Sequence, residues 1–279
     1  MAVERLYLMC CGHVLGLRGV LYQGGGFEPV RIPLLCALLI HPEHGPVIVD
    51  TGYGPQSRSH VGLFPEGLGR LLMPGATRPE WDLRHYLDVA DIEPSEVAHG
   101  ILTHLHNDHT GGICDFLEHT TFTLAYEELR VARGFSRLGA LLRGFTQIEF
   151  PEGLRFEFDQ PRPDPTVPVF ERSHDLFGDG SIRLIPTPGH TAGHRSVWVR
   201  LASGREILLL GDACYHTESY RRPAPPGRLV RGVAYDPEQA WATVLKVRRL
   251  ARERPDVLMI PCHDFDLWPT LRQFPEYYQ

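Results

Sequence analysis

Short apolar runs separated by polar turns recur along the first half of the chain. Residues 34–40 and 47–49 are two such runs, divided by a polar segment containing proline and glycine, and they predict a hairpin of two buried strands. Similar runs predict strands at residues 97–102 and 122–124, and another near the N-terminus at residues 4–8.

The same pattern returns after residue 180. A strand is predicted at residues 181–186, followed by a hairpin of residues 196–201 and 206–210 around a Ser-Gly turn, and a last short strand at residues 257–260. Helices are predicted at three places in the first half, residues 81–89, 126–133 and 135–143, and again after Asp236. That last helix has Asp236 as its N-cap and a proline at its first position.

Three stretches lack a clear period. Residues 12–26 are rich in glycine, and Gly24-Gly25-Gly26 predicts a flexible break at their end. Residues 57–76 combine glycine and proline with large apolar side chains, which predicts a loop that lines a pocket or folds onto its own domain. Residues 151–179, with five prolines and alternating charges, predict an irregular insertion or a hairpin.

Strand pairs mixed with helices in both halves predict an α+β fold, with two packed mixed sheets flanked by helices. A chain of 279 residues, 43% of them hydrophobic, can bury a substantial core. We therefore expect a single domain spanning residues 1–279.

The composition indicates in which compartment the protein works and which classes of partner it is not suited to bind. The net charge of −6, with no basic run, argues against nucleic acid, and no apolar stretch reaches the roughly 18 residues of a membrane span. The six cysteines form no C-x-x-C pair, so they predict free thiols in a reducing, cytoplasmic compartment. Residues 6–17 are apolar enough for a signal peptide, but His13 and two glycines interrupt them, which favours a strand.

The strongest chemical signal is Thr-His-Leu-His-Asn-Asp-His-Thr-Gly-Gly at residues 103–112, directly after a predicted strand. In an extended segment His104 and His106 share a face, and Asp108 and His109 follow where the chain can turn toward a second atom. Imidazole and carboxylate groups together suit Zn²⁺ and similar divalent ions. Packing gives no reason for four such groups on one short loop, so the motif predicts a metal site.

This motif resembles the signature of the metallo-β-lactamase superfamily, whose members bind two metals at the edge of an αββα sandwich. The resemblance requires a His, an Asp and a His downstream, each at a strand end, and His190, Asp212 and His263 occupy such places. It implies three ligands of the first metal: His104, His106 and His190. It implies three of the second, Asp108, His109 and His263, with Asp212 bridging both.

The resemblance also implies supporting side chains. Asp50 ends the strand at residues 47–49 and corresponds to the family's Asp-x-Gly, which supports a metal-ligating histidine. His194 also matches a recurrent family position, and we interpret it as a side chain that supports the metal ligands without binding the metal itself. The alternative is that His194 is an ordinary turn histidine.

Tyr215, three residues after the bridging Asp212, is similar to a position of the N-acyl-homoserine lactonases in this superfamily. Gly-Leu-Phe at residues 62–64, Thr-Pro-Gly-His at 187–190 and the segment 274–277 extend that likeness over nearly the whole chain. It implies a dinuclear zinc hydrolase that opens N-acyl-homoserine lactones by attack of a metal-bridging hydroxide, as in quorum quenching. Asp108 and Tyr215 would be its catalytic side chains.

The expected partner is a small-molecule lactone, and the sequence leaves a homodimer open. We expect its acyl chain to contact residues 14–22 and four apolar side chains: Leu63, Phe64, Leu68 and Met73. The alternatives are a glyoxalase II-like thioesterase, a lactonase for another small lactone, a di-iron redox centre and a non-catalytic metal-binding module. Two observations disfavour the first and third: no basic cluster suits a glutathione carboxylate, and the chain is too short for a flavin domain.

Overall fold

The computed structural model describes residues 1–55, 75–135, 153–222 and 224–279. The loop expected at residues 57–76 and the helix expected at 135–143 lie almost wholly outside these ranges.

The first sheet contains most of the strands of the N-terminal half. Its order is β14-β1-β2-β3-β5-β6-β7, with β4 paired to β1. The bounds are β1 Arg5–Leu17, β2 Pro29–His41, β3 Gly45–Val49, β4 Gly75–Ala76, β5 His99–Ile101, β6 Thr121–Leu124, β7 Arg155–Phe158 and β14 Tyr277–Tyr278. Strands β1, β2 and β3 run antiparallel, and β3, β5, β6 and β7 run parallel, so the sheet is mixed.

The second sheet has the order β13-β12-β11-β10-β9-β8. The bounds are β8 Arg162–Pro163, β9 Arg172–Asp175, β10 Ile182–Pro186, β11 Arg195–Arg200, β12 Glu206–Gly211 and β13 Leu258–Pro261. Its one parallel pair in the described chain is β12 with β13, which brings the ends of these two strands to the same edge.

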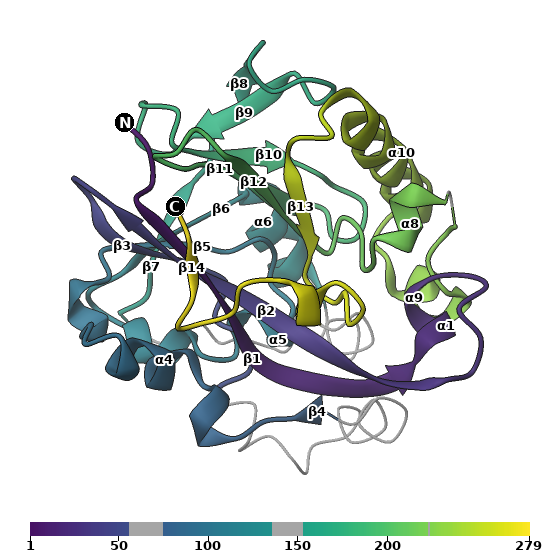
Figure 1. The fold of residues 1–279 in the computed structure, drawn as a ribbon, viewed down its shortest axis with the longest axis horizontal. Coiled ribbons are helices and arrows are strands. Elements are labelled where there is room, and N and C mark those ends of the chain that lie inside the picture. The colour runs from purple at the N-terminus through teal and green to yellow at the C-terminus, as the bar shows by residue number, and fades with distance from the viewer. Residues whose placement is uncertain (56–74, 136–152, 223) are drawn as a thin grey trace.

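Helices cover the outer faces of the two sheets, and Figure 1 shows α4 and α10 on opposite sides of the molecule. The α-helical bounds are α1 Arg18–Leu21, α4 Leu83–Val89, α5 Asn107–Thr110, α6 Tyr126–Gly134, α8 Glu218–Arg221, α9 Arg228–Val233 and α10 Pro237–Glu253. Short 3₁₀ turns occupy η1 Pro79–Trp81, η2 Pro94–Glu96, η3 Ile113–Phe116 and η4 Trp268–Thr270. Asp236 caps α10 by accepting hydrogen bonds from two backbone N–H groups, as predicted.

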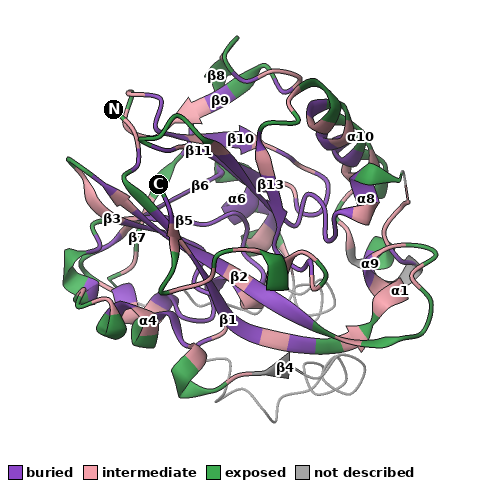
Figure 2. Ribbon diagram, in the orientation of Figure 1, coloured by how far each residue is buried: buried purple, intermediate pink, exposed green. Residues whose placement is uncertain are grey.

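Apolar side chains fill three layers between these elements. One buried cluster lies between the sheets and includes Leu39, Val49, Val197 and Ile207. A second lies between the first sheet and α4 and α6, and a third between the second sheet and α10. Buried residues follow the strands of both sheets, whereas the helices are exposed on their outer sides (Figure 2). The predicted arrangement of two packed sheets flanked by helices is confirmed.

Strand β1 extends beyond the strand predicted at residues 4–8 and continues to Leu17 across a shift of register between Cys10 and His13, which confirms the strand favoured for residues 6–17. Gly24, Gly25 and Gly26 lie outside any helix or strand, between α1 and β2, where the break was expected. One local prediction was wrong in part: residues 153–179 contain an expected hairpin, β8–β9 of the second sheet, but they also supply β7 to the first sheet and so are not an irregular insertion. Within the described residues, no helix combines the length and apolar character needed to cross a membrane.

Candidate metal centre

The seven predicted ligands come together at one edge of the two sheets. His104 and His106 lie in the loop after β5, and Asp108 and His109 lie in α5, which begins directly after that loop. The other three, His190, Asp212 and His263, follow β10, β12 and β13, respectively. Residues separated by up to 159 positions therefore converge because their strands end at the same edge.

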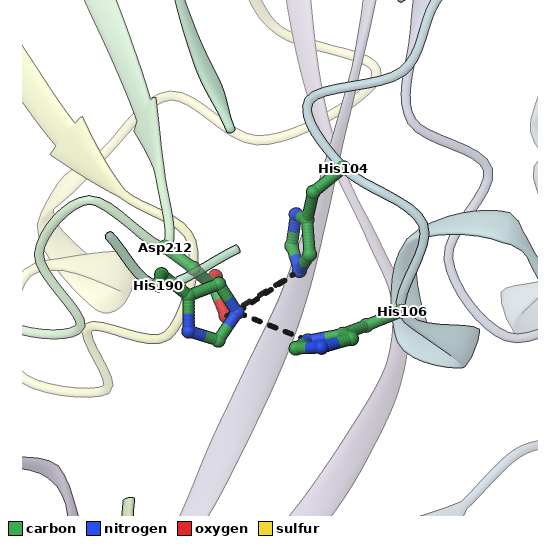
Figure 3. Close-up of side chains that lie close together, drawn as sticks. All are labelled: His104, His106, His190 and Asp212. Atoms are coloured by element: carbon green, nitrogen blue, oxygen red, sulfur yellow. Dashed lines mark hydrogen bonds and ion pairs between the residues drawn. The ribbon is translucent and has the colours of Figure 1, made fainter. Parts of the chain in front are cut away.

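Three histidines and one carboxylate form the first group, and Figure 3 shows the three imidazole rings pointing toward one another. His190 Nε2 lies 3.2 Å from His104 Nε2 and 3.0 Å from His106 Nδ1. Asp212 Oδ2 lies 3.2 Å from the same His190 nitrogen. One imidazole nitrogen carries at most one proton, so it cannot satisfy all these neighbours by hydrogen bonding. A shared cation satisfies them all.

A second group faces the other oxygen of Asp212. Its Oδ1 lies 3.1 Å from His263 Nε2 and 3.5 Å from His109 Nε2. Asp108 Oδ2 approaches the same two imidazole nitrogens, at 3.6 Å and 3.8 Å. The Asp212 carboxylate thus lies between two groups of donors, with one oxygen toward each.

In the first group the ionisation states suit metal ligands. Burial, together with the neighbouring histidines, holds the pKa of His104 well below its ordinary value, and burial does the same for His190. Burial alone would raise the pKa of Asp212, but the surrounding histidines, His263 first, lower it well below its ordinary value. Neutral imidazoles and an ionised carboxylate are the forms that bind divalent metals.

In the second group burial alone would lower the pKa of His109 and of His263. The carboxylates beside them, Asp50 and Asp212 first, instead raise the pKa of both histidines well above its ordinary value, so a bound cation would take the place of their protons.

The buried polar atoms also fit a metal centre. Within the described part of the chain, His109 Nε2 and Asp212 Oδ1 are among the few buried side-chain atoms that have no hydrogen-bond partner. Leaving such atoms unpaired costs about 1–3 kcal/mol each, more for a charged group. Both atoms point into the second group, where a cation would pair with them.

We propose that Asp50 supports the site from outside the ligand set. Its Oδ2 lies 2.7 Å from His109 Nδ1 and accepts the Thr103 hydroxyl at 2.7 Å, while Oδ1 accepts the Thr103 backbone N–H at 2.8 Å. A carboxylate on Nδ1 places the His109 proton there, and we infer that Nε2 keeps its lone pair for a metal.

His194 contacts the backbone of a predicted ligand. Its Nε2 accepts the backbone N–H of Asp212 at 2.9 Å, and its Nδ1 lies 2.8 Å from the Thr187 hydroxyl. Burial lowers the pKa of His194 to about 3, so the ring is neutral and can accept this bond. We therefore propose that it positions Asp212, and its contacts differ from those of an ordinary turn histidine.

Tyr215 lies against both groups. Its hydroxyl is 2.6 Å from His190 Nδ1, and its ring stacks on that of His263, with centroids 6.0 Å apart and 18° between the planes. Burial, then the nearby Asp212 carboxylate, raises the pKa of the phenol well above its ordinary value, so it keeps its proton.

Sequence reasoning missed Glu128, a fully buried side chain in the first turn of α6. Its two carboxylate oxygens accept the backbone N–H of Leu105 at 3.1 Å and of Gly193 at 2.7 Å. Leu105 stands between His104 and His106, so Glu128 ties two ligand-bearing loops together. A glutamate whose oxygens accept backbone N–H groups of two distant loops leaves no signal in the sequence.

We expect Glu128→Ala to lower the free energy of unfolding by about 3 kcal/mol, because two buried N–H groups lose their acceptor. Denaturant titration of the protein, with and without a metal chelator, measures this. The matched control is Glu127→Ala, since Glu127 is exposed on the same helix and its ion-pair partner in the described part of the chain is Arg130. That control should change stability by less than about 0.5 kcal/mol, and equal effects of the two variants would contradict the role of Glu128.

A cavity of about 280 Å³ opens beside the first group. It extends from His190, Asp212 and Tyr215 to a mainly apolar wall formed by α9 and α10, including Val230, Ala240 and Trp241. The four apolar residues predicted to contact a substrate, Leu63, Phe64, Leu68 and Met73, lie outside the described residues. Of the segment 14–22, Val14 and Leu21 are buried in the cluster that contains Tyr215, whereas Leu15 and Leu17 are exposed.

Comparison with known proteins identifies relatives over most of the chain. A family model described as the metallo-beta-lactamase superfamily matches residues 36–263. The chain is 30% identical over 262 residues to the N-acyl homoserine lactonase AttM of Rhizobium johnstonii, covering 92% of this chain and 90% of that protein. It is 33% identical over 259 residues to a probable metallo-hydrolase of Mycobacterium tuberculosis, covering 89% and 80%.

Solved structures share the fold. An N-acyl homoserine lactone hydrolase with the product N-hexanoyl-L-homoserine at its catalytic metal centre matches with a TM-score of 0.81 over 100% of both chains, at 22% identity. AidC, a dizinc quorum-quenching lactonase in complex with a product, matches with a TM-score of 0.64 over 99% of this chain and 96% of its own, at 14% identity. These likenesses confirm the αββα sandwich.

Proposed function

The chain belongs to the metallo-beta-lactamase superfamily, and on this premise we propose that it is a dinuclear metal-dependent hydrolase that opens the ring of N-acyl homoserine lactones. The observation that carries the proposal is the Asp212 carboxylate between two groups of buried histidines, with one oxygen toward each. The relatives that are N-acyl homoserine lactonases support the choice of substrate, since that group includes AttM, which aligns over 92% of this chain.

We assign the first metal to His104, His106 and His190, the second to Asp108, His109 and His263, and the bridge to Asp212. Zinc is the metal we propose, because imidazole and carboxylate donors suit it. When bound, the two metals supply Lewis acidity toward a carbonyl and make water a nucleophile at neutral pH.

Six free cysteines support a cytoplasmic location, and we treat residues 1–279 as one catalytic domain.

The protein's own side chains orient the reaction. We propose that the His190 Nδ1–H donates to the Tyr215 oxygen, which leaves the phenol proton free to donate to the lactone carbonyl as negative charge develops on it. Tyr215 lines the cavity together with His190 and Asp212, which supports placing the lactone carbonyl near its hydroxyl. Asp108 is more exposed than Asp212, and we propose that it passes a proton to the alkoxide that leaves when the ring opens.

Metal analysis combined with a pH-drop assay on a lactone, a thioester and a phosphodiester tests this function. We expect about two divalent metals per chain, turnover of N-acyl homoserine lactones, loss of turnover on chelation and its return with zinc. Preferential turnover of the thioester would contradict the lactonase and favour a glyoxalase II-like enzyme. Zero or one metal in fully active protein would reject the dinuclear centre.

We also propose that the acyl chain of the substrate enters the cavity between Tyr215 and α10. Ala240→Leu fills part of this space, so kcat/KM should fall more for long-chain than for short-chain lactones. Each methylene excluded from the cavity costs roughly 0.8 kcal/mol, or about fourfold in kcat/KM. The control is Ala242→Leu, on the exposed side of the same helix. A loss independent of chain length in Ala240→Leu would contradict this placement.

A further inference from the structure

Cys262 lies inside the second group of donors. Four side chains there, His109, Asp212, Cys262 and His263, each offer a ligand atom, and these four atoms lie within 4.8 Å of one another. All four side chains are buried. The assignment of ligands by family resemblance includes the other three and omits the thiol.

The local backbone explains how two consecutive residues reach one site. Along an extended strand, Cys262 and His263 would point to opposite faces. Strand β13 ends at Pro261, however, and residues 262 and 263 form a turn. The Cys262 backbone N–H donates to the Gly211 carbonyl at 3.2 Å, which holds this turn beside Asp212.

The surroundings of the sulfur suit a metal ligand. The backbone N–H of Leu35 donates to Cys262 Sγ at 3.3 Å, and the thiol donates to the Leu35 carbonyl at 3.6 Å. A metal that takes the place of the thiol proton would leave the N–H donor beside the sulfur. On the other side of the group, His263 Nδ1 donates to the Pro33 carbonyl at 2.9 Å, which leaves His263 Nε2 for the metal. Strand β2 thus orients both neighbouring side chains through its backbone.

Independent evidence for a cation here comes from the unpaired atoms of the same group. His109 Nε2 and Asp212 Oδ1 are buried without a hydrogen-bond partner, and both belong to the four-residue set that contains Cys262. Asp108 reaches the histidines of this group from a side chain that is 23% exposed, whereas Cys262 is 4% exposed. The metal position therefore has a carboxylate toward solvent and a sulfur toward the core.

We propose that Cys262 is a sulfur ligand of the second metal, which makes the two metal positions chemically different. The first has nitrogen and oxygen donors only, and the second adds a soft donor that favours zinc, cobalt or cadmium over magnesium or manganese. Binding at the second position releases the thiol proton. The inference rests on the dinuclear centre proposed above and deepens it.

Cobalt substitution tests the ligand directly, without reference to activity. Protein loaded with two Co²⁺ per chain should show a thiolate-to-cobalt charge-transfer absorption in the near ultraviolet. The band should vanish in Cys262→Ala and persist in Cys36→Ala, a matched control because Cys36 is also a buried thiol on the adjacent strand β2. A dicobalt protein without the band, or a band that survives in Cys262→Ala, overturns the proposal and leaves the dinuclear centre standing.

X-ray absorption of the unmodified zinc protein provides a second measurement if Cys262→Ala does not fold. We expect one sulfur at about 2.3 Å per two zinc ions, the usual Zn–S distance. A spectrum with only nitrogen and oxygen neighbours in protein that holds two zinc ions overturns the sulfur ligand alone. Protein that binds fewer than two metals under saturating conditions overturns the dinuclear centre and the sulfur ligand together.

Discussion

Asp212→Ala is expected to abolish most lactone hydrolysis and to lower the metal content below two per chain. Its two oxygens are the only described carboxylate atoms that face both groups, one toward His190 and the other toward His263. Without this carboxylate, each metal would be surrounded mainly by neutral imidazoles, and less negative charge would balance the charge of the metal. Because metal catalysis supplies several kcal/mol, we expect kcat/KM to fall at least about 10³-fold.

Metal analysis and kinetics at saturating zinc separate the two effects of this variant. Asp212→Asn keeps the shape but not the charge, so it should retain more metal than Asp212→Ala and still lose most activity. A surface control, Asp256→Ala, removes a carboxylate whose partner is Arg254 and should leave both metals and kcat/KM nearly unchanged. An Asp212→Ala protein with two metals and wild-type kinetics would refute the bridging role.

The predicted site residues that the structure brings together from distant strands share one physical cause. His190, Asp212 and His263 each follow a buried apolar strand, and such strands have a clear pattern because both faces are covered. A histidine or aspartate at the end of such a strand is easy to recognise as a candidate ligand in the sequence, because a buried charge or imidazole needs a partner. The αββα arrangement follows from the same strands.

The elements and contacts that the sequence did not predict depend on exposure, short length or neighbours in space, none of which the order of apolar and polar residues reveals. Strand β7 is largely exposed at the sheet edge, so Arg155–Phe158 shows no buried run, and β8 and β9 are too short for a period. The contacts of Glu128 join a helix to two distant loops through backbone N–H groups. Cys262 belongs to no C-x-x-C pair, so the sequence predicts only a free thiol, whereas its neighbours in space include His109 and Asp212.

Tyr215→Phe is expected to lower kcat on lactones by roughly 10- to 100-fold. The hydroxyl has two proposed functions: it accepts the His190 Nδ1 proton at 2.6 Å, and its own proton is available to the substrate carbonyl. Loss of a partner that orients a metal-ligating histidine costs 10- to 100-fold, and loss of a donor to a developing oxyanion costs about 100-fold or more when it acts alone. Bound metals would also stabilise negative charge near the carbonyl, which would reduce the second effect.

Kinetics of Tyr215→Phe at saturating zinc distinguish a donor from a packing residue. A donor that strengthens in the transition state mainly affects kcat, so KM should change little. The ring remains stacked on His263, so stability should fall by no more than about 1–3 kcal/mol, the cost of leaving the His190 Nδ1–H without its acceptor. Tyr220→Phe is the matched control: Tyr220 is also a buried tyrosine with a raised pKa, caused mainly by burial, and it does not line the cavity. Wild-type turnover by Tyr215→Phe would leave the phenol a packing residue and remove the most specific support for lactone opening.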